Sequence, residues 1–290
     1  MSDTLTFNIP SFTSDEPHKI VIHQAVNADE NQGQSETNTG FVMWPSAVLL
    51  SHHISKKPSI VLGDENSPDG DVMELGSGCG LVGLTAATLL QNAEEEKEDK
   101  VIFTDYNPVV LENLQKNIEL NDFDVDHEVL GLDWFDQEEH QEQQQQLKEQ
   151  EEGGEESINT TWVDVQGNEH AQVRLILGAD LIVCTNDADL VASTIDNALV
   201  EGGKALILGA DEYTRFGVKN FPDACQSLGL KVTVHEDLLD SNFVVAEEDS
   251  DIQQQDLMEE LELGGYNQRA STMAHDFTLF KITKPIVSSA

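Results

Sequence analysis

Positive charge is scarce in this sequence. Among its 290 residues, 55 are acidic and 15 are basic, which gives a formal net charge of −40. Because proteins bind nucleic acids mainly through cationic contacts to phosphates, this balance argues against a nucleic-acid partner. The acidic excess suits a basic protein partner, but it equally suits plain solubility and solvated insertions, and both interpretations stay open.

Cysteine is scarce too, and long apolar runs are missing. Cys79, Cys184 and Cys225 are dispersed, have no metal-ligand spacing and cannot all pair with one another. This pattern predicts a reducing compartment and no metal site. No apolar run reaches the roughly eighteen residues of a membrane span, and the N-terminus has no basic segment followed by an apolar one. We therefore expect a cytoplasmic protein, with the nucleus as the alternative, and no membrane contact.

Two segments have the wrong composition for a core. Residues 137–159 are rich in Gln and Glu, and residues 247–262 form a second acidic stretch. We expect the first to be a disordered or loosely helical insertion and the second an acidic insertion. Since such insertions account for much of the length, we predict that residues 39–136 and 160–290 form a single domain, behind an N-terminal hairpin and polar loop at 1–38.

The remaining sequence alternates between short apolar runs and helical patterns, which predicts an α/β fold with a doubly wound sheet. The predicted hairpin strands cover residues 5–9 and 19–26. The predicted sheet strands cover residues 72–75, 100–104, 126–130, 174–177, 204–208, 230–235 and 277–283. Ligands of such sheets bind at the carboxyl ends of strands, so residues that directly follow a strand are the candidates for a site.

A glycine-rich turn after the strand at residues 72–75 is the strongest local signal. Gly76, Gly78 and Gly80, with Ser77 between them, let the backbone turn sharply into a helix close to a bound ligand. A dinucleotide site has the spacing G-x-G-x-x-G, whereas this chain has G-x-G-x-G preceded by Glu74. A carboxylate there suits a cationic ligand better than a phosphate. A nicotinamide-dependent oxidoreductase is the alternative from another enzyme class.

Three further motifs accompany this turn. T-G-x-x-x-W-P-x-A at residues 39–47 opens a helix, and T-D-Y-N-P and L-I-L-G-A-D follow at 104–108 and 175–180. Together the motifs resemble the methyltransferase-16 family of class I, seven-β-strand methyltransferases, many of which methylate lysine side chains. The resemblance implies a Rossmann-like, mostly parallel seven-stranded sheet with helices on both faces, behind the hairpin. It also implies S-adenosyl-L-methionine as the cofactor, with its methionine part across the glycine turn and Trp44 beside it.

Two strand ends supply candidate contacts to the adenosine part of that cofactor. Asp105 follows the second sheet strand, where a carboxylate can accept both ribose hydroxyls, and Tyr106 is next to it. The other interpretation of Asp105 is a helix N-cap. The resemblance places Asp133 and Trp134 near the adenine; physically, the carboxylate can accept the amino hydrogens while the indole covers a ring face. Packing in the core is the other interpretation of Trp134.

The fourth sheet strand leads into Ala179 and Asp180, where cofactor and acceptor should meet. The family has an acidic residue here, followed three residues later by Tyr or Phe, but this chain has Val183. Valine cannot contact an amine by cation–π attraction, so the departure weakens a lysine assignment. A different nucleophile, an aromatic ring from elsewhere such as Tyr213, or lost activity are the alternatives. Asn186 and Asp187, just beyond Val183, are candidates for polar contacts to the acceptor. Their other interpretation is a loop or cap before the next helix.

The sequence therefore predicts an S-adenosylmethionine-dependent methyltransferase. We expect a monomer that methylates a lysine of a basic protein, with Asp180 accepting a hydrogen bond from the incoming amine. A small-molecule methyltransferase and a cofactor-binding protein without catalysis are the alternatives. Base methylation of nucleic acid is disfavoured, because the chain has no Asn/Asp-Pro-Pro-Tyr run and an unfavourable charge.

Overall fold

The computed structural model describes residues 2–14, 16–25, 36–93, 98–137, 161–210, 215–236 and 277–287. Its centre is a seven-stranded sheet in the order β10-β11-β9-β8-β3-β4-β5. The strands are β3 (Val72–Leu75), β4 (Val101–Asp105), β5 (His127–Gly131), β8 (Val173–Ala179), β9 (Leu199–Ala210), β10 (Lys231–His235) and β11 (Phe277–Thr283). Only β11 is antiparallel to its neighbours, β9 and β10. The predicted fold class is confirmed.

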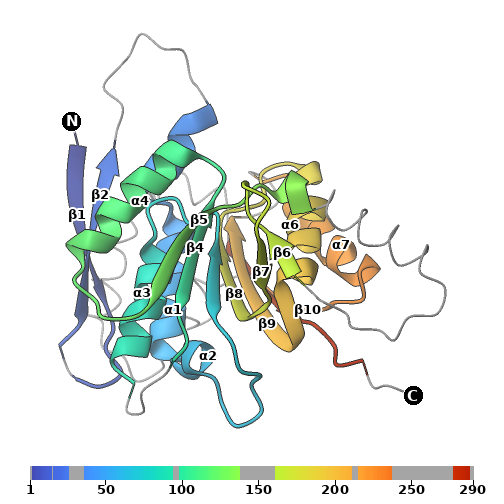
Figure 1. The fold of residues 1–290 in the computed structure, drawn as a ribbon, viewed down its shortest axis with the longest axis horizontal. Helices are drawn as coiled ribbons and strands as arrows, with labels where there is room; N and C mark the ends of the chain where they lie inside the picture. Colours follow the sequence, from blue (N-terminus) through green and yellow to red (C-terminus); the bar gives the residue numbers. More distant parts are fainter. Residues whose placement is uncertain are drawn as a thin grey trace.

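Helices cover both faces of this sheet (Figure 1). On one face lie α1 (Pro45–Lys56), α2 (Ser59–Leu62), α3 (Leu81–Gln91) and α4 (Pro108–Leu120), and on the other lie α6 (Thr185–Ala198) and α7 (Phe221–Ser227). Because side chains alternate along a strand, Val72 packs in the first layer and Met73 in the second. Among the described residues, no helix is both long and apolar enough to cross a bilayer.

The predicted N-terminal hairpin is present as β1 (Ser2–Ile9) paired antiparallel with β2 (His18–Ala25). It docks on α4 through asparagines spaced one helical turn apart. Asn117 accepts a hydrogen bond from the His23 amide at 2.8 Å, and Asn121 accepts from the Val21 amide and donates to the Val21 carbonyl, both at 2.7 Å. These bonds satisfy backbone groups at the open edge of β2, which a packed helix would otherwise leave without partners.

The sequence did not predict a second small hairpin, β6 (Thr161–Val163) paired with β7 (Glu169–Ala171). Its buried Trp162 stacks on His170 with ring centroids 4.4 Å apart. Gln137 is fully buried, donates to the Val163 carbonyl at 2.6 Å and accepts from the Val163 amide at 3.2 Å. The prediction that an insertion begins at residue 137 is thus wrong at that residue, because its amide group pairs with β6. The rest of that insertion, up to residue 159, and the acidic stretch 247–262 lie outside the described residues.

Candidate active site

A cavity of about 610 Å³ lies at the carboxyl ends of β3, β4, β5 and β8, a size typical of small-ligand pockets. The chain places β4 and β5 on one side of β3 and then crosses to β8 on the other side. This is the reversal of strand order at which α/β sheets bind ligands. All residues predicted for cofactor binding and catalysis line this one cavity: Trp44, Glu74, Gly76, Ser77, Gly78, Gly80, Asp105, Tyr106, Asp133, Trp134, Ala179 and Asp180. Of the two further candidates for acceptor contacts beyond Val183, Asp187 lines the cavity and Asn186 does not.

The glycine turn after β3 has a backbone conformation that other residues rarely adopt. Gly78 has φ +53° and Gly80 has φ +88°. A Cβ on Gly78 would lie 3.3 Å from the Gly40 carbonyl oxygen, and one on Gly80 would lie 2.4 Å from Leu114 Cδ1. Glycine is therefore needed at both positions for the turn itself. At Gly78 it also allows the close approach of η1 (Glu36–Phe41), the 3₁₀ helix before α1, and at Gly80 the close approach of α4.

Ser77 and Glu74, the polar residues at the turn, differ in their hydrogen bonding. Ser77 Oγ donates to the Glu74 carbonyl at 3.3 Å and accepts from the Thr104 amide at 3.0 Å, which ties β3 to β4. The Glu74 side chain is buried, and its Oε2 has no hydrogen-bond partner among the described residues. Burial raises the pKa of Glu74 to about 8, so the carboxyl is mainly protonated at neutral pH.

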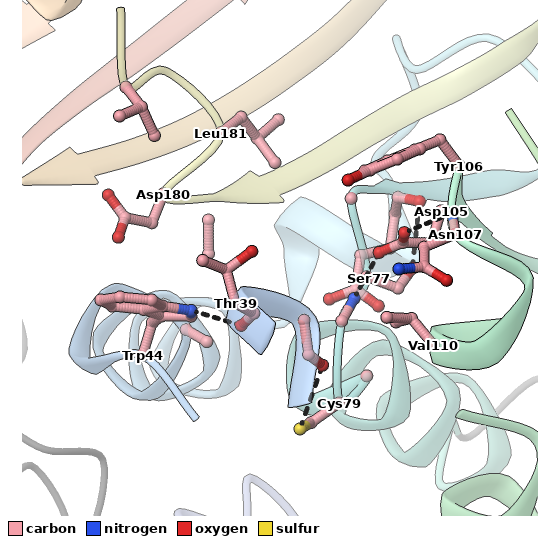
Figure 2. A pocket seen from close by; sticks show the side chains of 18 of the residues that line it. Thr39, Trp44, Ser77, Cys79, Asp105, Tyr106, Asn107, Val110, Asp180 and Leu181 are labelled. Carbon is pink, nitrogen blue, oxygen red and sulfur yellow. Dashed lines mark hydrogen bonds between the residues drawn. The ribbon is translucent and has the colours of Figure 1, made fainter. Parts of the chain in front are cut away.

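Asp105 ends β4 with its carboxylate held in place by backbone groups. Its Oδ2 accepts from the Gly78 amide at 3.2 Å and its Oδ1 from the Asn107 amide at 3.0 Å (Figure 2). Each oxygen keeps a second lone pair for a ligand, as two adjacent hydroxyl donors require. Asn107 caps α4 by accepting from the Val109 amide. The cap therefore belongs to Asn107, and the N-cap interpretation of Asp105 does not hold.

Asp133 and Trp134 follow β5 and line the part of the cavity where the adenine is predicted to bind. Asp133 Oδ1 accepts from the Phe135 amide at 3.0 Å. Trp134 is partly buried and packs against the apolar layer of α6 and α7. Its Cζ2 lies 3.7 Å from where a Cβ of Gly76 would be, so the indole lies next to the glycine turn. Trp134 therefore packs in the core and also lines the cavity, and its contact with an adenine stays a prediction.

Asp180, the predicted catalytic residue, has a strained backbone and a partner that the sequence did not indicate. Its φ is +58°, and its amide donates to the Leu208 carbonyl at 2.7 Å. Arg215 donates from Nε to Asp180 Oδ1 at 2.9 Å and from Nη2 to Oδ2 at 2.7 Å. The Arg215 guanidinium carbon also lies 5.4 Å from the centre of the Trp44 ring, whose Nε1 donates to the Thr39 carbonyl. Figure 2 shows Asp180 and Trp44 together on one side of the cavity, with Ser77 and Asp105 on the other.

The residues just beyond β8 separate into a cap and an exposed wall. Asp187 Oδ2 accepts from the Val183 and Cys184 amides at 2.9 and 2.8 Å, so Asp187 caps α6 while also lining the cavity. Val183 lines the cavity and is 50% exposed. Tyr213, the predicted alternative source of an aromatic ring, lies outside the described residues.

Comparisons with known proteins point to one family. The family model described as lysine methyltransferase matches residues 24–149. Calmodulin-lysine N-methyltransferase of Arabidopsis thaliana is 36% identical over 85 residues, which are 29% of this chain and 24% of that protein. An uncharacterized protein of Dictyostelium discoideum is 37% identical over 86 residues, which are 30% of this chain and 21% of that protein. The chain thus spans about a quarter or less of the length of either relative.

The solved structures to which this chain is similar include methyltransferases. A TehB-like SAM-dependent methyltransferase from Corynebacterium glutamicum is 12% identical, covers 83% of this chain and 88% of its own, and has a TM-score of 0.42. A 16S rRNA methyltransferase of T. thermophilus, in complex with AdoMet and guanosine, is 13% identical, covers 97% of this chain and 50% of its own, and has a TM-score of 0.47.

The family match and the strand order agree with the motifs. The model match contains the glycine turn, Asp105 and Trp134, and the sheet has the seven-stranded, mostly parallel order that the resemblance implies. The cofactor of that family is S-adenosyl-L-methionine. The resemblance to the methyltransferase-16 family is therefore confirmed over residues 24–149, on a class I methyltransferase fold.

Proposed function

We propose that this protein transfers a methyl group from S-adenosylmethionine to a lysine side chain of a protein. The observation that carries the proposal is the cavity itself, which brings the glycine turn, Asp105 and Asp180 together at the reversal of the strand order. A cofactor that lies across the turn would thus present its reactive group near Asp180.

The residues present fit this cofactor. Gly76, Gly78 and Gly80 line the cavity without side chains, so a ligand can lie close to the backbone of the turn. Both oxygens of Asp105 are oriented by amide donors, which prepares them for a pair of ribose hydroxyls. When bound, the cofactor would supply an electrophilic methyl group on a positively charged sulfur.

The protein's own part in this reaction is orientation and the exclusion of water. The cavity has apolar walls, formed by Trp44, Trp134 and Leu181. Such walls favour a neutral amine over a protonated, hydrated one. Holding nucleophile and methyl in line is worth about 7–11 kcal/mol of the barrier in favourable intramolecular cases. A lysine amine, with an unperturbed pKa of about 10.4, has to lose a proton before it attacks.

Lysine as the acceptor is supported by the description of the family model and by the name of the Arabidopsis relative. Val183 stands against it, because this exposed side chain at the cavity wall offers no aromatic face to an amine. A small molecule is the second candidate acceptor, and valine in place of Tyr or Phe at position 183 favours it.

The test is transfer of isotope-labelled methyl from S-adenosylmethionine into a cell lysate, with protein and metabolite fractions separated. The wild type is compared with Asp105→Ala and with Asp69→Ala, an exposed carboxylate outside the cavity. A labelled protein band with wild type and Asp69→Ala but not with Asp105→Ala supports the proposal. Label in metabolites alone would replace lysine with a small acceptor, and no label at all would refute a methyltransferase.

Binding of S-adenosylhomocysteine provides a second readout for Asp105. Removing the carboxylate removes two charge-assisted hydrogen bonds, each worth about 1.5–3 kcal/mol, so we expect the affinity to fall at least tenfold. Calorimetry on the three proteins measures this directly. Equal affinities of wild type and Asp105→Ala would contradict the role of Asp105 in cofactor binding.

A further inference from the structure

Arg215 occupies a special place in the cavity. It is the single basic residue among the described residues that line it, and its side chain is only 19% exposed. Two parallel hydrogen bonds, at 2.9 and 2.7 Å, join its guanidinium to both oxygens of Asp180, whose side chain is 6% exposed. The same guanidinium lies 5.4 Å from the Trp44 ring. Arg215 therefore links two predicted site residues that are far apart in the sequence.

Asp180 and Trp44 together have the chemistry of a cation site. A carboxylate binds guanidinium and ammonium ions through charge-assisted hydrogen bonds, and an aromatic face attracts them through its π electrons. The hydrogen bond from Trp44 Nε1 to the Thr39 carbonyl fixes the ring, and the bond from the Asp180 amide to the Leu208 carbonyl fixes the strand end. Arg215 fills this site in the structure, so its positive charge already balances the carboxylate.

We propose that Arg215 makes the acceptor site select an amine in its neutral form. The identity of the acceptor as an amine rests on the function proposed above. An incoming ammonium would meet the Arg215 charge and would find both Asp180 oxygens engaged. A neutral amine avoids that repulsion and can still donate to a remaining Asp180 lone pair. Arg215 is thus a positioning and specificity-determining residue, which prevents the unreactive ammonium from binding where the nucleophile must attack.

The pairing persists over the relevant pH range. A guanidinium does not lose its proton in proteins, whereas an amine changes form around pH 10.4. The other ionisable groups that line the cavity are Glu74, Cys79, Asp105, Tyr106, Asp133 and Asp187. Of these, Glu74, with a pKa raised to about 8 by burial, changes its protonation within the pH range of the test. All of these groups line the cavity in the wild type and in any Arg215 variant alike, so a comparison between the two proteins isolates the contribution of Arg215.

The experiment measures the binding of n-butylamine, the chemical equivalent of a lysine side chain, to the complex with S-adenosylhomocysteine between pH 7 and pH 9. The neutral fraction of the amine rises tenfold per pH unit in this range, because its pKa lies above it. We expect the apparent affinity of the wild type to rise about tenfold per pH unit. In Arg215→Ala the vacated cation site should accept the ammonium, so the affinity should be nearly independent of pH and at least tenfold tighter at pH 7.

Chemical rescue gives an independent readout. Methylguanidine should bind Arg215→Ala at least tenfold more tightly than wild type at pH 7, since it can replace the missing side chain. It should also restore the steep pH dependence of butylamine binding. In the double variant with Asp180→Asn, this tight binding should be lost. Arg215→Lys keeps the charge and should keep the wild-type slope, which covers the case in which Arg215→Ala does not fold.

Several results would overturn the inference. One is a wild-type affinity for butylamine that does not change with pH. Another is the same pH dependence of this affinity in wild type and Arg215→Ala. A third is the lack of any butylamine binding at about 50 mM. The function proposed above is judged separately by label transfer. Label confined to metabolites together with the steep wild-type slope refutes lysine as the acceptor and leaves Arg215 in its role, whereas labelled protein with a flat slope does the reverse.

Discussion

Replacing Glu74 by Gln should stabilise the protein increasingly as the pH rises from 5 to 8. The carboxyl is buried next to the glycine turn, and burial raises its pKa from 4.5 to about 8. Between these two values the folded state keeps a proton that the unfolded state releases. The unfolded state is therefore favoured progressively as the pH rises, and a Gln side chain, which does not titrate, removes this effect.

The size of the effect follows from the pKa. Each pKa unit corresponds to about 1.4 kcal/mol, so the free energy of unfolding of the wild type loses roughly 5 kcal/mol through Glu74 between pH 4.5 and pH 8. We expect Glu74→Gln to gain a large part of this relative to wild type. At about 2 °C per kcal/mol for a chain of this length, the difference in Tm should widen by several degrees.

Thermal unfolding of both proteins, followed at half-unit steps from pH 5 to pH 8.5, measures the difference. Because the net charge of −40 affects both proteins alike, the comparison cancels the general effect of pH on an acidic chain. A difference in Tm that stays constant with pH, or one that shifts in favour of the wild type as the pH rises, would show that Glu74 is ionised in the folded protein.

Two further substitutions test the packing that positions the site. Gly80→Ala should lower the free energy of unfolding by about 2–5 kcal/mol in denaturant titrations, because a Cβ would lie 2.4 Å from Leu114 Cδ1 at φ +88°. Gly167→Ala is its control, with φ +80° and no atom within 4 Å of the new Cβ, and should cost only about 1 kcal/mol; equal losses would contradict the clash. Asn121→Ala should cost about 1–3 kcal/mol and speed hydrogen exchange at the Val21 amide, whereas unchanged exchange would show that the hairpin docks without that bond.

Most of the candidate site could be predicted because its residues follow strands directly. Glu74, Asp105 and Asp180 lie at or next to the carboxyl ends of β3, β4 and β8, and parallel strands bring those ends to one edge of the sheet. Their local motifs were therefore sufficient to place them around one cavity. The roles assigned to them in cofactor and acceptor binding stay predictions.

The packing of Gln137 and the hairpin of β6 and β7 could not be predicted from the sequence. For Gln137 the reason is that composition describes a whole segment and not each of its residues. Gln137 stands at the start of a Gln- and Glu-rich run, yet its amide pairs with both backbone groups of Val163. The hairpin of β6 and β7 was missed because its strands, Thr161–Val163 and Glu169–Ala171, are too short to show a period. Only the position of Gln137 against β6 reveals that it belongs to the folded part.

The sequence by itself determined the α/β class, the glycine turn and the line of candidate residues at the strand ends, because these depend on patterns within a few neighbouring residues. Only the tertiary structure decided that Arg215 joins Asp180 to Trp44, since none of the sequence motifs contains residue 215. This contact across the fold places a positive charge beside the Asp180 carboxylate. The motif therefore identifies Asp180, but its chemistry is known only once its ion-pair partner Arg215 is known.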